Sequence, residues 1–216
     1  MANYLKKASN WKSILLLFII LGGFNFFAFP RYEAKINEVA EVDFKLLDVR
    51  LNYTYEDVVE AFDKIGAEGR SIYAFIIVKI DMVYPIIYGL FLILLFFALI
   101  QIVFSQNSKL IYLSLIPVIG VIFDYLENFN TLKLLNNYPN ITFQQVKYGS
   151  HMTQLKSIFL SLTIGLIIIL SIVWLYKRIN VKINLIKIKN TKTIWKSIIY
   201  FIYLQIEKMK NNRKKR

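Results

Sequence analysis

Four long hydrophobic stretches, separated by polar segments, dominate the pattern of the chain. Each is long enough to cross the hydrocarbon core of a bilayer, which takes about 20 residues of α-helix. The pattern therefore predicts an all-α integral membrane protein, a bundle of four transmembrane helices. The predicted helices comprise residues 13–30, 72–105, 109–130 and 153–176.

The two longest connections carry local patterns of their own. Residues 31–71 form an acidic loop, in which Thr54 and the acids after it predict the start of a short helix near 55–65. We expect Gly66 and Gly69 to end that helix. Residues 193–206 are apolar but short and include Lys196, which favours a helix lying in the membrane interface over a fifth crossing.

Charge predicts the orientation of the bundle. The tail, residues 177–216, has 13 basic residues and one acid, whereas residues 31–71 have 6 basic residues and 10 acids. Basic segments flank the cytoplasmic side, so both termini, including the basic residues 1–12, are expected in the cytoplasm. The turn from Ser105 to Lys109 is then cytoplasmic as well. The loops 31–71 and 131–152 are expected outside.

The first stretch could also be read as a cleaved signal peptide. It ends in Phe26-Phe27-Ala28-Phe29-Pro30 without a small-x-small pattern, which favours a retained helix. Abundant Ile, Lys and Asn indicate an AT-rich bacterial genome, and therefore a cytoplasmic membrane location.

Composition excludes several kinds of chemistry. The chain has no cysteine and one histidine, His151, so thiolate sites, disulfides and multi-histidine metal sites are ruled out. We expect His151 in the outer loop. Gly-rich phosphate loops and Gly-x-Ser-x-Gly elbows are absent too. The sequence therefore predicts no metal and no cofactor, and no motif supports nucleic-acid binding.

Polar side chains gather at the predicted outer ends of three of the hydrophobic helices. Ionisable residues inside a membrane are costly, so they mark a functional site by default. Within the second and third helices their spacing of three, four or seven residues places them on one face. The candidates are Asp81, Tyr84 and Tyr88 on the second helix, Asp124, Glu127 and Asn128 on the third, and Lys156 on the fourth.

Straight-helix geometry suggests which of these residues meet. At about 1.5 Å per residue, Asp81 stands roughly 15 Å above Asp124, so we expect Asp81 at the lip of a pocket with Arg70 and Lys79. The two tyrosines then share the level of Asp124, Glu127 and Asn128. We expect Lys156 or a tyrosine hydroxyl to pair with Asp124.

Three functions fit this pattern. The first is an outward-facing pocket for a lipid or other amphiphilic small molecule, bound by Asn128, Lys156 and the tyrosines. The second is an intramembrane hydrolase or isomerase with Asp124 or Glu127 as the acid or base. The third is a structural or accessory subunit with a protein partner, in which the polar residues only hold helices together. Membrane lipids are expected partners in each case, and the basic tail suits anionic lipid headgroups.

Overall fold

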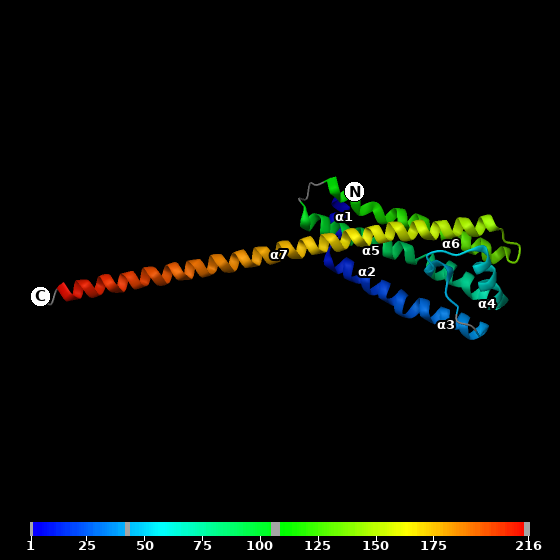
Figure 1. Ribbon diagram of the computed structural model, residues 1–216, viewed down its shortest axis with the longest axis horizontal. Coiled ribbons are helices and arrows are strands. Elements are labelled where there is room, and N and C mark those ends of the chain that lie inside the picture. The colour runs from blue at the N-terminus through cyan, green and yellow to red at the C-terminus, as the bar shows by residue number, and fades with distance from the viewer. Residues whose placement is uncertain (1, 42–43, 105–108, 214–216) are drawn as a thin grey trace. The chain divides into compact units, whose positions relative to one another are not determined.

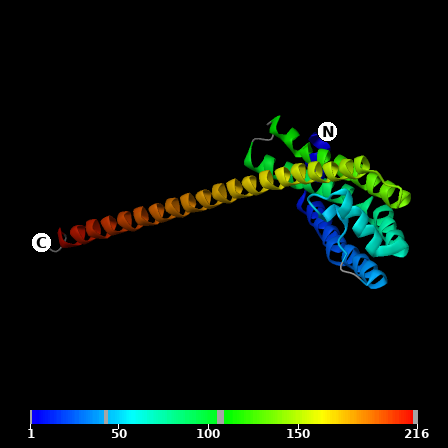
Figure 2. The same cartoon turned by 45° about the vertical axis from the view of Figure 1, so that its right-hand side comes forward.

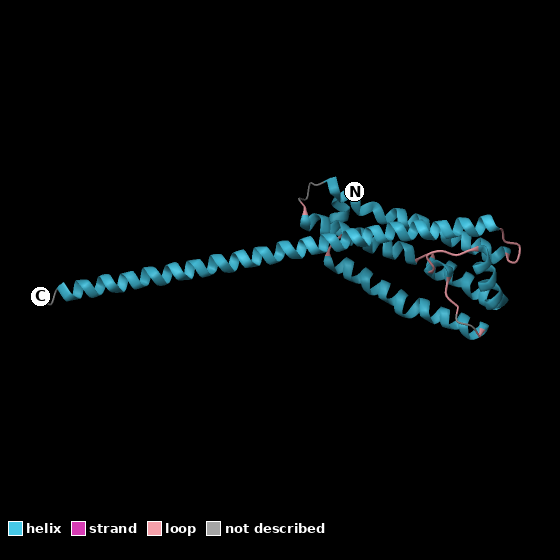
Figure 3. Cartoon of the chain, viewed as in Figure 1, coloured by secondary structure: helices cyan, strands magenta, loops and turns pink. Residues whose placement is uncertain are grey.

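The computed structural model describes residues 2–41, 44–104 and 109–213, and in these ranges the chain is helical, with loops and without strands (Figures 1 and 3). Residues 105–108, most of the predicted Ser105–Lys109 turn, lie outside this description. The α-helices are α1 (Ala2–Ala8), α2 (Trp11–Gly23), α3 (Phe29–Ala40), α4 (Tyr55–Ile76), α5 (Tyr84–Val103), α6 (Ile116–Asn137) and α7 (Phe143–Arg213).

The prediction of four apolar helices is confirmed. The segments long and apolar enough to cross a membrane are Trp11–Ala40, Tyr55–Val103, Lys109–Asn137 and Phe143–Asn180. Large apolar side chains point outward from them: Phe26 is 77% exposed and Phe27 is 74% exposed. Such side chains are unfavourable against water and favourable against lipid, as a membrane protein requires.

The first hydrophobic helix continues beyond Pro30, where we expected the acidic loop to begin. A π-helical turn, Phe24–Ala28, joins α2 to α3, and Pro30 lies in the first turn of α3. The chain stays helical through this proline to Ala40. Helix α3 packs along α4 and buries Ile36 completely.

Helix α4 begins where the sequence predicts. Thr54 Oγ1 accepts a hydrogen bond from the Asp57 N–H at 3.2 Å, and Asp57 Oδ2 accepts one from the Thr54 N–H at 2.7 Å, which completes a capping box. At Gly66 the backbone leaves the helical region, with φ +61° and ψ −173°, and a second helical run follows directly. The predicted helix near 55–65 therefore forms, and Gly66 ends it with a kink.

A second π-helical turn, Ile77–Asp81, precedes α5 and creates a bend that α6 stabilises. Pro85 has no N–H to donate to the carbonyl of Asp81, four residues earlier. Asn128 Nδ2 donates to that carbonyl at 3.2 Å, and the Tyr125 hydroxyl donates to the carbonyl of Met82 at 2.7 Å. Two side chains of α6 thus satisfy backbone groups that the bend leaves without helical partners.

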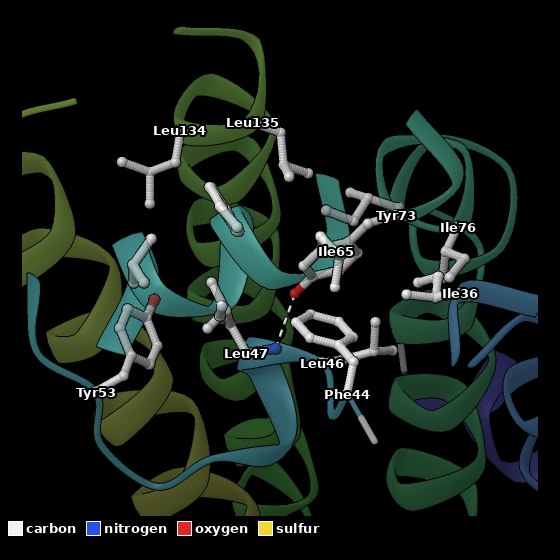
Figure 4. Close-up of a cluster of buried hydrophobic side chains, with 14 of the residues drawn as sticks. Ile36, Phe44, Leu46, Leu47, Tyr53, Ile65, Tyr73, Ile76, Leu134 and Leu135 are labelled. Atoms are coloured by element: carbon white, nitrogen blue, oxygen red, sulfur yellow. Dashed lines mark hydrogen bonds between the residues drawn. The ribbon is translucent and has the colours of Figure 1, made fainter. Parts of the chain in front are cut away.

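Two apolar clusters hold residues 1–170 together, and α5 runs beside α6 in both views (Figures 1 and 2). One cluster joins α2, α5 and α7 through residues such as Leu21, Phe96 and Ile167. The other joins α3, α4, the end of α6 and the loop before α4. In that loop the Leu47 N–H donates to the Tyr73 hydroxyl oxygen at 2.9 Å, which fixes the loop on α4 (Figure 4).

Residues 171–216 form a second compact unit, and its described residues, as far as Arg213, are helical as part of α7. Within it the Arg178 guanidinium lies 5.5 Å from the centre of the Trp174 ring. Apart from that of Lys196, which is exposed, the side chains of the predicted interfacial helix 193–206 lie outside the described residues. Its placement in the interface stays a prediction.

The close contact between α5 and α6 yields a stability prediction. A Cβ atom on Gly89 would lie 2.6 Å from Val121 Cγ2, whereas one on Gly165 of α7 would meet nothing within 4 Å. We expect Gly89→Ala to lower the free energy of unfolding by about 1–3 kcal/mol through overpacking. Gly165→Ala, the matched control, should leave it unchanged or raise it by up to about 1 kcal/mol. Thermal unfolding in one detergent measures both, and equal stabilities would contradict this packing.

Candidate functional site

A cavity of about 480 Å³ opens among α2, α3, α5, α6, α7 and the loop before α4. Its volume lies within the range of small-molecule sites. One part of its wall is apolar and another part is polar, and four of the residues predicted from sequence belong to the polar part. They are Tyr84, Tyr88, Asp124 and Lys156, and Asp81 is a fifth predicted residue in the lining.

Lys156 is the centre of a buried ion network. Its Nζ lies 2.5 Å from Glu127 Oε2 and 3.6 Å from Asp124 Oδ1. The Thr153 hydroxyl donates to the other Glu127 oxygen at 2.6 Å. Glu127 is 1% exposed and Asp124 is 4% exposed, so the lysine compensates two carboxylates that water does not reach freely.

Tyr88 completes the coordination of Asp124. Its hydroxyl donates to Asp124 Oδ2 at 2.6 Å, so each oxygen of this carboxylate has a polar neighbour. Tyr84 lies one helical turn before Tyr88, and the Asn25 amide of the first π-helical turn donates to its hydroxyl at 3.1 Å. Both tyrosines and Asp124 therefore have fixed orientations at the cavity wall.

Asp81 lines the same cavity as Asp124, although straight-helix counting places it at the lip. It is 5% exposed. The 3₁₀ helix of residues 109–115, before α6, removes part of the counted separation, because it rises about 2.0 Å per residue and so lifts Asp124 by about 3–4 Å.

The other predicted residues lie outside the lining. Asn128 and Glu127 each contact a residue of the lining without belonging to it. Asn128 donates to the backbone carbonyl of Asp81, and Glu127 forms an ion pair with Lys156. Arg70 donates to the Phe62 carbonyl at 2.6 Å and lies 4.6 Å over the Tyr138 ring. Lys79 is exposed and does not line the cavity. The predicted lip of Arg70, Lys79 and Asp81 is therefore not assembled.

Sequence reasoning missed Asp48, which the loop before α4 brings to the cavity. Leu46 and Leu47, directly before it, are buried, and the Leu47 N–H is held by Tyr73. At the far end of the loop, the Tyr53 N–H donates to Ser150 Oγ of α7 at 3.2 Å. The available signal was an acid next to two leucines inside a loop, a pattern typical of a loop that packs inward.

His151 lies in α7 and is exposed, not in the loop where we expected it. The loop is short because α6 extends to Asn137 and α7 begins at Phe143. A smaller cavity of about 290 Å³ borders His151, Ser150 and Tyr53. Burial raises the pKa of the Tyr53 hydroxyl above its ordinary value, so this group stays protonated at neutral pH.

Across the described part of the chain, no three His, Cys, Asp or Glu side chains are placed to hold a metal ion together. Asp124 and Glu127 are instead arranged around Lys156, and Asp124 also accepts the hydrogen bond of the Tyr88 hydroxyl. Comparison of the chain with protein-family models, curated proteins and solved structures finds no match.

The ion network predicts a large effect for a single substitution. Lys156→Met should lower the free energy of unfolding by about 3–5 kcal/mol, because it leaves two buried carboxylates without a cation. Thr153→Val removes only one hydrogen bond and should cost about 1–3 kcal/mol. Denaturant unfolding in detergent measures both. A Lys156→Met protein as stable as the Thr153→Val protein would show that the lysine does not compensate the carboxylates.

Proposed function

We propose that this multi-pass membrane protein binds a lipid or other amphiphilic small molecule in the cavity between its helices. The observation that carries the proposal is the division of the cavity wall into a polar part and an apolar part. A molecule with a polar head and an apolar tail matches such a wall.

The division follows the helices. On α7 the lining residues Lys156, Leu160 and Ile164 are four residues apart on one face, and they change from charged to apolar along the chain. On α5 the change from Tyr84 and Tyr88 to Leu92 has the same direction. These helices share one orientation in the proposed topology, so the polar part of the wall lies at the same membrane side in both.

The proposed location is the cytoplasmic membrane of a bacterium, with both termini in the cytoplasm. The basic tail and the acidic segment 31–71 support this orientation through the positive-inside rule. The polar part of the cavity then faces the outer side of the membrane. Ligands of the proposed site would come from the outer leaflet or from the outside.

A substitution in the apolar part of the wall tests the proposal. Ile164→Trp should obstruct the space for the tail and reduce the amount of co-purifying amphiphile at least about tenfold. Ile158→Trp is the matched control, because Ile158 lies on the same helix, is exposed and does not line the cavity. Native mass spectrometry of each gently purified protein measures the bound species. An unchanged bound species in both variants would overturn the proposal.

An intramembrane acid–base enzyme is the second candidate. The observation in its favour is the continuous network from Tyr88 through Asp124 and Lys156 to Glu127, because a hydroxyl, two carboxylates and an ammonium group could hold or pass a proton next to a ligand. In this role Asp124 or Glu127 is the acid or base.

Incubation with a total bacterial lipid extract separates the two candidates. An enzyme would convert one lipid species in proportion to protein concentration, and Asp124→Asn would abolish the conversion. A binding protein would leave the composition of the extract unchanged. Lipid mass spectrometry before and after incubation is the measurement, with the Ile158→Trp protein as the positive control for folding.

A further inference from the structure

Asp81 is a buried carboxylate without a described partner. It is 5% exposed and lines the cavity, and its carboxylate forms no hydrogen bond or ion pair with any residue in the described ranges. The contact with Asn128 uses its backbone carbonyl and leaves the side chain unused. A carboxylate in such a place is costly unless something else compensates it.

Asp48 presents a second incompletely paired carboxylate to the same cavity. Its Oδ1 atom is buried and has no hydrogen-bond partner among the described residues. The loop that carries it is fixed at both ends, by Tyr73 on α4 and by Ser150 on α7. The position of Asp48 at the cavity is therefore imposed by the fold.

Lys156 forms its ion pairs with other acids and not with Asp81 or Asp48. It is the only basic side chain among the described residues that line the cavity, and its nearest partners are Glu127 and Asp124. One positive charge is thus already shared between two carboxylates, and Asp48, Asp81 and Glu33 add three more acids to the lining. The polar part of the cavity lacks positive charge.

Aromatic rings complete the surroundings. The Tyr84 ring lies 5.1 Å from the Phe29 ring and 5.4 Å from the Tyr88 ring, centre to centre, and all three residues line the cavity. The faces of aromatic rings attract cations. Carboxylates with free acceptor atoms and aromatic walls are both suited to a protonated amine, which supplies hydrogen-bond donors and positive charge.

We infer that the cavity selects amphiphiles with a protonated amine as the head, bound between Asp81 and Asp48, and with the apolar tail along Leu92 and Ile164. This inference rests on the proposed binding function and narrows it to one class of ligand. The amine would supply a direct ionic partner for these two acids, which form no ion pair with Lys156.

Titration with three twelve-carbon probes tests the inference. n-Dodecylamine, 1-dodecanol and dodecanoate share one tail and differ in the charge of the head. Native mass spectrometry of the full-length protein in a non-ionic detergent at neutral pH gives the bound fraction of each probe. We expect dodecylamine to bind at least about tenfold more tightly than dodecanol, and dodecanoate to bind most weakly.

Variants assign the effect to the two acids. Asp81→Asn and Asp48→Asn should each reduce the affinity for dodecylamine about tenfold or more, and should change the affinity for dodecanol less than about twofold. Glu68→Gln is the matched control, because Glu68 is exposed on α4 and lies outside the cavity. Dodecanol binding also reports that each variant is folded.

Each outcome has a distinct meaning. Equal affinities for dodecylamine and dodecanol, both weakened by Ile164→Trp, would overturn the amine inference and keep the cavity as a binding site. Binding of no probe, or binding that Ile164→Trp does not weaken, would overturn the proposed function itself. If phosphatidylethanolamine displaces bound dodecylamine, the amine belongs to a membrane lipid, and if it does not, the ligand is a free amine. Either result agrees with the inference.

Discussion

The buried ion network of Lys156 with Glu127 and Asp124 is the interaction on which the interior of the structure depends. These three side chains belong to α6 and α7, two helices apolar enough to cross a membrane, where isolated charges are very unfavourable. The lysine makes both carboxylates tolerable, and through Asp124 it orders Tyr88 of α5. The network thus links three helices: the lysine joins α7 to α6, and Asp124 joins α6 to α5.

A second constraint is the bend before α5. Proline at position 85 and the π-helical turn before it leave backbone carbonyls without helical donors, and α6 supplies the Asn128 amide and the Tyr125 hydroxyl. The same face of α6 carries Asp124. Asp81 ends the π-helical turn of this bend and lines the cavity. The same stretch of backbone therefore needs polar partners on α6 and also carries a carboxylate of the site.

Much of the architecture follows from the sequence. The four apolar helices, the Thr54 cap and the partnership of Asp124 with a lysine and a tyrosine could all be predicted, because they depend on hydropathy, local spacing and the cost of buried charge. The position of Asp81 could not. Height along a helix was counted at one rise per residue, and the 3₁₀ helix before α6 changes that rise.

The position of Asp48 could not be predicted from the sequence for a different reason. The two leucines before it indicate a loop that packs inward, but the position of Asp48 at the cavity depends on long-range contacts of that loop with Tyr73 and Ser150. Arg70 of α4 does not reach the cavity either. Its guanidinium binds the Phe62 carbonyl and the ring of Tyr138, which follows α6. Helices and their polar faces are encoded locally, whereas the contents of the cavity are decided by tertiary contacts.

A double-mutant cycle on Lys156 and Glu127 tests the central claim most directly. The free energy of unfolding would be measured for the wild type, Lys156→Met, Glu127→Gln and the combined variant in one detergent. If the ion pair organises the interior, the combined variant should be more stable than the sum of the single effects implies, with a coupling energy of about 1.5 kcal/mol or more. Effects that add within about 0.5 kcal/mol would contradict the account, since independent residues behave in that way.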